Sequence, residues 1–256
     1  MEIAKKIYWN KRSETYNLLD SVGTRQAYRI ANIVKMFSIN NPFVVDVGCG
    51  PGIISRIVKE RLRTSKVLGI DISERMIDFA KRSIINNLGF LESDFLDDSL
   101  QKHLNNRVDV FIMSLFMHHM ADGKDLIVLE KSYELLKNNG YILVAEAVPP
   151  EDEILGEYKL IFSFKETRNC YIPSNLISML RKVGFIGVRF VDYPFKIKLK
   201  NWLNDKTLSE WRKGLIYDLH VNATPQFKKA YNMVAFPGGD YELTCKMCLV
   251  WGQKRV

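Results

Sequence analysis

The chain has 256 residues, of which 47% are hydrophobic and 26% charged, a composition typical of a globular domain. No apolar run approaches the roughly 20 residues of a membrane-spanning helix, and the N-terminal stretch lacks the apolar core of a signal peptide, so we expect a cytoplasmic protein. The formal net charge of +8 would suit a nucleic acid or another acidic partner. The Lys and Arg residues are spread along the chain without a dense basic block, however, which favours solvated surfaces.

Residues 1–40 are predicted to be helical, because apolar residues recur there at three- and four-residue steps. The next stretch changes this pattern. Phe43–Val47 is a short, β-branched run closed by glycines, which predicts a buried strand, and apolar residues return to helical spacing from Ile53 onward. A strand, a glycine turn and a helix N-terminus together favour a site for a polar ligand.

The glycine turn narrows the choice of ligand. Gly48, Gly50 and Gly52 have the spacing G-x-G-x-G, and the dinucleotide fingerprint G-x-G-x-x-G fails because Ile53 stands where its third glycine would be. Asp46 precedes the turn by two residues, and its carboxylate would repel a pyrophosphate and attract an ammonium group. We therefore disfavour a nicotinamide dehydrogenase and expect a ligand that is cationic at one end and nucleoside-like elsewhere.

A second strand–turn–helix unit follows. Residues 67–70 form an apolar run that Asp71 ends, and Ser73 is a suitable N-cap for the helix that contains Met76. Asp71 comes 25 positions after Asp46, close to the spacing of an acidic residue that binds a ribose. A carboxylate only accepts hydrogen bonds, which suits a pair of vicinal hydroxyls. Helix capping by Asp71 is the alternative, although Ser73 already supplies a cap.

The segment Val45–Gly52, with its D-x-G-x-G-x-G pattern, resembles the first motif of class I S-adenosylmethionine-dependent methyltransferases. The lead-in from Tyr8 to Tyr16 resembles methyltransferases of the ubiquinone/menaquinone biosynthesis type, in which this segment closes over the cofactor. The resemblance implies S-adenosyl-L-methionine as the cofactor, with Tyr16 either touching it or packing its helix onto the core. The residues that we assign to cofactor binding are Tyr16, Asp46, Gly48, Cys49, Gly50, Gly52, Asp71, Ile72, Met76, Ser93, Asp94, Phe95, Ser114, Leu115 and Phe116.

The third and fourth units fit the same resemblance. Ser93–Phe95 resembles the motif in which an aspartate, here Asp94, receives the adenine amino group, with Phe95 beside the ring. Residues 108–113 predict a central strand. By resemblance, Ser114–Phe116 after this strand would line the methionine arm of the cofactor.

Two histidines follow the fourth strand. His118 or His119 would face the acceptor, and we favour His119 as a base because histidine titrates near neutral pH. The alternative is that such a histidine only satisfies local backbone groups. Glu146 is a second candidate base, because it lies at the carboxyl end of the fifth predicted strand, the edge where open α/β sheets bind ligands.

The alternation of strands and helices predicts an α/β fold: a Rossmann-like, doubly wound, seven-stranded sheet, mostly parallel. By resemblance, the last strand, residues 243–251, inserts antiparallel beside the sixth, residues 186–192. We expect an N-terminal helical lid (residues 1–40), a cofactor-binding core (41–193 and 241–256) and a helical cap insertion (194–240). The cap segment is rich in aromatic residues, which suggests a cover over the pocket mouth or, alternatively, a satellite cluster packed on the sheet.

The resulting functional prediction is a methyltransferase that acts on a small molecule by in-line methyl transfer. An RNA or protein methyltransferase is an alternative because of the positive charge, although the N-P-P-[YF] signature is absent after the fourth strand. A non-catalytic cofactor-binding protein is another. We expect no metal site, since the C-x-x-C pair Cys245 and Cys248 lies in a predicted strand, where the two side chains diverge. The acceptor atom and the oligomeric state do not follow from the sequence.

Overall fold

The structure is a computed structural model, and it describes residues 2–12, 21–82, 84–120 and 123–255. The strands are β1 (Phe43–Val47), β2 (Lys66–Asp71), β3 (Leu88–Glu92), β4 (Val108–Ser114), β5 (Leu136–Val148), β6 (Ile186–Lys198), β7 (Val234–Phe236) and β8 (Asp240–Gln253). The helices of the core are α1 (Glu2–Arg12), α2 (Ser21–Met36), α3 (Ile53–Arg61), α4 (Glu74–Ala80), α5 (Asp98–Leu104), α6 (Lys124–Leu135) and α8 (Pro173–Val183). The remaining helices are α7 (Leu155–Lys165), α9 (Leu199–Leu203), α10 (Glu210–Val221) and α11 (Pro225–Ala230), with short 3₁₀ turns η2 (Met117–His119) and η3 (Asp152–Ile154).

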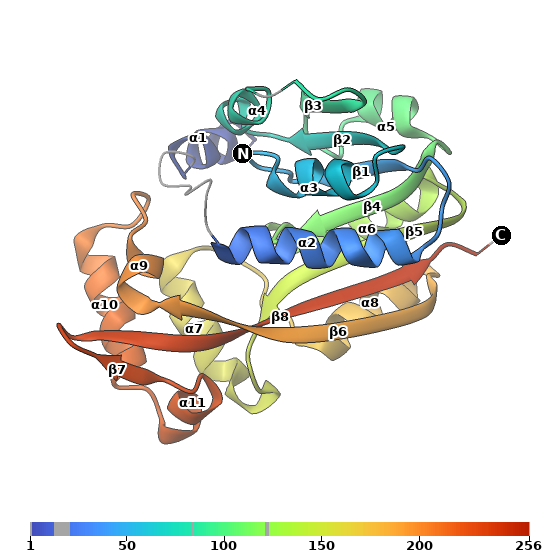
Figure 1. The fold of residues 1–256 in the computed structure, drawn as a ribbon. Helices are drawn as coiled ribbons and strands as arrows, with labels where there is room; N and C mark the ends of the chain where they lie inside the picture. The colour runs from blue at the N-terminus through green and yellow to red at the C-terminus, as the bar shows by residue number, and fades with distance from the viewer. Residues whose placement is uncertain (1, 13–20, 83, 121–122, 256) are drawn as a thin grey trace.

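One sheet organises the fold, with the strand order β3-β2-β1-β4-β5-β8-β6 and the short β7 paired to β8. Strands β1 to β5 are parallel to one another, and β8 runs antiparallel to both β5 and β6. In Figure 1 the arrows of β2 and β4 point toward α1, so the carboxyl ends of the parallel strands lie under this helix. The predicted doubly wound α/β class and the antiparallel last strand are confirmed.

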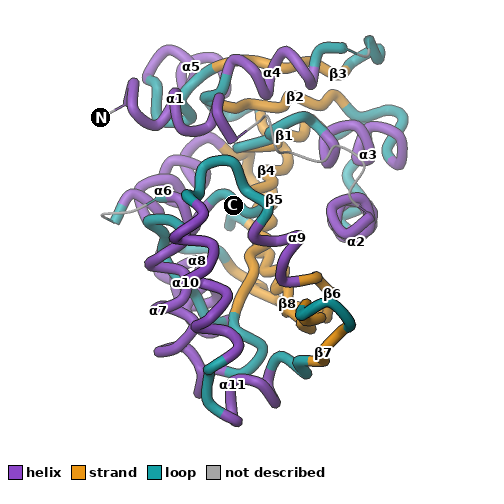
Figure 2. Tube along the Cα trace, turned by 90° about the vertical axis from the view of Figure 1, so that its left-hand side faces the viewer, coloured by secondary structure: helices purple, strands orange, loops and turns teal. Residues whose placement is uncertain are grey.

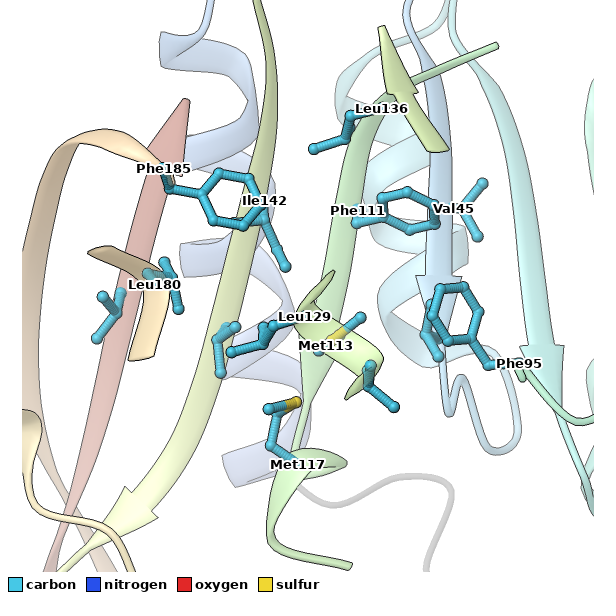
Figure 3. Packing of buried hydrophobic residues seen from close by; sticks show 14 of the residues in the cluster. Val45, Phe95, Phe111, Met113, Met117, Leu129, Leu136, Ile142, Leu180 and Phe185 are labelled. Atoms are coloured by element: carbon cyan, nitrogen blue, oxygen red, sulfur yellow. The ribbon is translucent and has the colours of Figure 1, made fainter. Parts of the chain in front are cut away.

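Helices cover both faces of the sheet (Figure 2), with α2 and α3 on one side and α6 and α8 on the other. Because β1 and β4 are buried on both faces, they read as nearly continuous apolar runs. On one face, Val45 of β1, Phe111 of β4 and Ile142 of β5 meet Leu129 of α6 and Leu180 of α8 (Figure 3). A second cluster lies between the opposite face and helices α2 and α3. These two cores fix the strands from which the functional turns project.

The segments after β5 and β6 pack together as a third cluster. Its buried side chains come from η3, α7, α9, α10, α11 and β8, and they are Ile154, Tyr158, Ile161, Leu199, Leu203, Leu208, Ile216, Phe227, Tyr231 and Leu243. The helical part of the insertion begins at Leu199 rather than at residue 194, because β6 continues to Lys198 in register with β8. Figure 1 shows this unit beyond one end of the sheet, on the side of the parallel strands' carboxyl ends.

Two further features bear on the sequence-based expectations. Within the described ranges no helix is both long enough and apolar enough to cross a bilayer. All four cysteines are free, and Cys248 lies in the first core whereas Cys245 packs against the cap cluster. The side chains of the C-x-x-C pair therefore diverge, as the strand assignment predicted.

Candidate active site

The glycine turn after β1 has the conformation that its sequence requires. Gly48, Gly50 and Gly52 have φ angles of 69°, 51° and 79°, in the region that L-residues rarely adopt. The amide of Gly48 donates to the carbonyl of Ile70 at 2.8 Å, and that of Cys49 donates to the same oxygen at 3.0 Å, so the turn is bound to the end of β2. The first two strand–turn units therefore form a single rigid edge.

The three glycines differ in what lies above them. A Cβ on Gly48 would come within 2.4 Å of the Phe116 ring, and one on Gly52 within 2.6 Å of Phe90. Among the described residues, and apart from its two chain neighbours, no heavy atom lies within 4 Å of a Cβ placed on Gly50. Gly48 and Gly52 are thus needed for the packing of the protein itself, whereas the backbone at Gly50 borders open space.

Asp71 stands at the end of β2 beside this open space. One carboxylate oxygen accepts from the Gly50 amide at 2.9 Å, and the other accepts from the Ser73 amide at 2.8 Å. Burial raises the pKa of Asp71, and these N–H donors oppose that effect. Each oxygen retains acceptor capacity, and the half-exposed side chain is positioned for a ligand hydroxyl.

Asp46 lies beneath the turn rather than on its surface. Its side chain is 1% exposed and accepts a 2.6 Å hydrogen bond from the Ser55 hydroxyl of α3. Burial raises its pKa to about 7, and the bond from Ser55 opposes the shift. The carboxyl group thus links β1 to the first turn of α3. It can influence a ligand only indirectly, by holding the glycine turn in place.

The adenine-side assignments separate into two groups. Ser93 and Asp94 are half-buried at the end of β3, and Asp94 accepts from the Leu96 amide at 2.9 Å. The Phe95 ring, by contrast, lies in the first core, 5.6 Å from the Phe111 ring in an edge-to-face contact (Figure 3). Its side chain is therefore a core residue and not a wall of the crevice.

The turn after β4 lies against the glycine turn. Ser114 accepts a 2.7 Å hydrogen bond from Gln26 of α2, a partner that the sequence did not suggest. Leu115 has a φ of 52° and is exposed, and its amide donates to Ala145. The Phe116 ring lies over Gly48. The two turns thus meet at this ring.

The N-terminal helix α1 lies across the edge that carries these turns. Asn10 accepts a 2.7 Å hydrogen bond from the Ser73 hydroxyl, and Lys6 forms an ion pair with Glu92 at the end of β3. Ile72 is half-buried and Met76 is buried beneath this contact. Tyr16, the remaining cofactor assignment, lies outside the described residues.

Beyond Phe116, the turn η2 carries the two histidines. His118 is buried, and its Nδ1 lies 2.6 Å from Oε2 of Glu146. The His118 amide also donates to the other Glu146 oxygen at 3.3 Å. Glu146 is fully buried, which raises its pKa to about 7, while the charge of Arg168 opposes the shift. Glu146 therefore supports the histidine turn from below and does not itself face a ligand.

His119 is the more exposed histidine, and its ring lies 4.5 Å from Trp9 of α1 and 3.8 Å from His118. A loop after α7 brings two more charged groups to this place: Arg168 pairs with Glu166 at 3.2 Å, and both side chains are buried. This pair was not predicted from the sequence, because Glu166 and Arg168 lie in a loop without a motif or periodicity. Only the folded chain brings them beside η2.

Comparisons with known proteins show which proteins the chain resembles. Residues 44–140 match the sequence model of the family described as "Methyltransferase domain". "Probable polyketide synthase 42" from Dictyostelium discoideum is 26% identical over 250 residues, which are 86% of this chain and 9% of that protein. A carboxy-S-adenosyl-L-methionine synthase from Helicobacter pylori (strain HPAG1) is 26% identical over 201 residues, 70% of this chain and 79% of that protein.

Among solved structures, a SAM-dependent methyltransferase from Archaeoglobus fulgidus superimposes with a TM-score of 0.59 at 19% identity. The superposition covers 89% of this chain and 92% of that one. At this level of identity the likeness concerns the fold, including the sheet edge that carries the glycine turn.

Proposed function

We propose that the chain, whose residues 44–140 match the model of a methyltransferase domain, is a class I S-adenosylmethionine-dependent methyltransferase that transfers a methyl group to a small-molecule acceptor. The observation that carries the acceptor class is the enclosure of the polar groups beyond Phe116. His118, Glu146 and the Glu166–Arg168 pair have side chains at most 7% exposed. A folded RNA or protein surface would not reach groups that are buried to this extent, whereas a small molecule admitted under a cover could.

The residues at the glycine turn fit the cofactor. The open space above Gly50 leaves room for a ligand against bare backbone, and Asp71 beside it offers fixed acceptors for ribose hydroxyls. Ser93 and Asp94 continue the same edge toward β3, where an adenine amino group would find an acceptor. S-adenosyl-L-methionine supplies an electrophilic methyl on a sulfonium; the protein supplies alignment and exclusion of water.

We assign different roles to the two candidate catalytic residues. His119 is the group that would take a proton from the acceptor, because it is the more exposed of the two histidines at the turn. Glu146 is a positioning residue, since it contacts η2 from the buried side and acts through His118. Asp46 is likewise a positioning residue for the glycine turn.

The outer segments complete the proposal. We propose that α1 acts as a lid, supported by the contacts of Trp9 with His119 and of Asn10 with Ser73. Helix α2, which the sequence grouped with it in residues 1–40, packs against the sheet in the second cluster instead. Residues 194–240 would serve as a cap that supports the acceptor side, with 41–193 and 241–256 as the core. We also propose that the chain resembles methyltransferases of the ubiquinone/menaquinone type, a likeness that only the lead-in segment from Tyr8 to Tyr16 supports.

Calorimetry with S-adenosyl-L-methionine tests the cofactor site. We expect Asp71→Ala to lower the affinity at least tenfold, and Asp78→Ala, an exposed carboxylate on α4, to leave it unchanged. The acceptor class is tested by incubating the enzyme and methyl-labelled cofactor with fractionated cell extract. Label in the small-molecule fraction supports the proposal, whereas label confined to RNA or protein, or no transfer to any fraction, refutes it.

A further inference from the structure

Two histidines and one carboxylate meet at the acceptor side of the sheet edge. One ligand atom from each of His118, His119 and Glu166 can be chosen so that all three lie within 4.8 Å of one another. We propose that these three residues form a binding site for a divalent transition-metal ion. The proposal concerns metal binding by the chain itself and does not depend on the methyl acceptor. Because a bound ion would occupy the lone pair of His119, this residue would act as a base only in the metal-free protein.

A carboxylate orients the first of these ligands. When Glu146 is ionised its oxygens only accept, so Nδ1 of His118 carries the proton and donates it to Glu146 across 2.6 Å. The lone pair of that imidazole is then on Nε2, the atom directed away from Glu146. Metal-binding histidines almost always have such a hydrogen bond on the other ring nitrogen, which fixes the tautomer and makes the ligand more basic.

The third ligand is also held in place. Arg168 pairs with Glu166 at 3.2 Å, and the loop after α7 is bound to η2 by the Asn169 amide, which donates to the His118 carbonyl at 2.8 Å. Tyr171 donates to the Met117 carbonyl at 3.1 Å. The histidine turn and the Glu166 loop are therefore one rigid unit, although far apart in sequence.

The buried carboxyl groups at this place suit a cation. Glu146 and Glu166 have side chains at most 7% exposed, and Glu166 pairs with Arg168. A divalent ion bound to the histidines would lie close to both carboxyl groups, which would stabilise it.

The ligand set indicates which ion would bind. Imidazole nitrogens favour zinc, cobalt, iron or nickel over magnesium and calcium, which prefer oxygen. Tetrahedral ligands at bonds of about 2.1 Å lie about 3.4 Å apart, so the three groups would move together by about 1 Å on binding. Three protein ligands leave at least one position open to water or a substrate atom.

Cobalt binding to the untagged, chelator-treated chain tests the proposal. We expect Co²⁺ to give visible absorption bands of a tetrahedral or five-coordinate complex at one equivalent, and Zn²⁺ to displace it. His119→Ala and Glu166→Gln should each weaken binding at least tenfold. His103→Ala removes an exposed histidine on α5 and should change nothing.

A second variant keeps the test informative if a ligand substitution unfolds the protein, which circular dichroism would reveal. Glu146→Gln retains an oxygen acceptor for His118 and should weaken cobalt affinity by roughly 10- to 100-fold. Absence of the cobalt bands in the folded wild type, or equal affinity in folded His119→Ala, overturns the proposal. Cofactor binding, measured separately without metal, is unaffected by that outcome.

Discussion

Gly50 is the position where a single methyl group should separate ligand binding from folding. Gly50→Ala places a Cβ in space where no protein atom lies within 4 Å, so the substitution causes no clash within the protein. The φ of 51° is unfavourable for an L-residue by about 1–2 kcal/mol. We therefore expect the free energy of unfolding to fall by that amount only, as measured by urea denaturation.

The effect on the ligand should be larger. If S-adenosyl-L-methionine lies against this backbone, the added methyl occupies part of its volume, and we expect calorimetry to show at least a tenfold loss of affinity, which is about 1.4 kcal/mol. Gly214→Ala in α10 is the matched control, since its Cβ also meets open space and should leave affinity unchanged. Wild-type affinity in Gly50→Ala would refute our placement of the cofactor.

The remaining predictions concern the glycine turn, its buried carboxyl group and the lid. Gly48→Ala should reduce stability by about 2–5 kcal/mol in the same denaturation assay, because a Cβ 2.4 Å from Phe116 adds overpacking to the strained φ. Because the pKa of Asp46 is raised from 3.8 to about 7, its contribution to stability is present at low pH and is lost as the pH rises from 3.8 toward 7. Asp46→Asn should flatten this dependence of the unfolding free energy on pH and should raise that free energy by up to about 4 kcal/mol above pH 7. An unchanged pH dependence in the variant would contradict this prediction. Trp9→Ala should raise the cofactor's dissociation rate several-fold in stopped-flow experiments while changing the unfolding free energy of the core little, and an unchanged rate would argue against the lid.

The strands and turns that carry the proposed cofactor side were predictable because each of them is local. A buried strand, a glycine turn and a capped helix follow one another within about 20 residues, and parallel strands bring their carboxyl ends to one edge. What the sequence could not show is which side chains of these turns face inward. Asp46 and Phe95 each have the right residue type at the right spacing, yet one bonds to α3 and the other packs in the core.

The acceptor side was poorly predictable for a related physical reason. Glu146 was identified as a candidate base from its place at a predicted strand end. Its contact with His118, however, depends on the register of β4 and β5, which the spacing of apolar residues does not predict. Glu166 and Arg168 come from a loop whose position depends on the packing of α7. Charged residues that become buried through tertiary contacts leave no pattern in the sequence, because the same residue types are common on solvated surfaces.

The packing of the cap explains how this loop is held. The aromatic residues of the insertion largely contact each other and α7: Trp202 meets Phe162 at 5.4 Å, and Phe227 meets Tyr231 at 4.6 Å. They therefore form a core of their own, whereas the sequence left open both a cover over the pocket mouth and a satellite cluster packed on the sheet. Tyr158 in addition ties α7 to the Ala147 carbonyl of β5 at 3.1 Å. A cap built in this way fixes the end of α7, and with it Glu166 and Arg168, so we expect acceptor selectivity to depend on these charged groups more than on the aromatic residues.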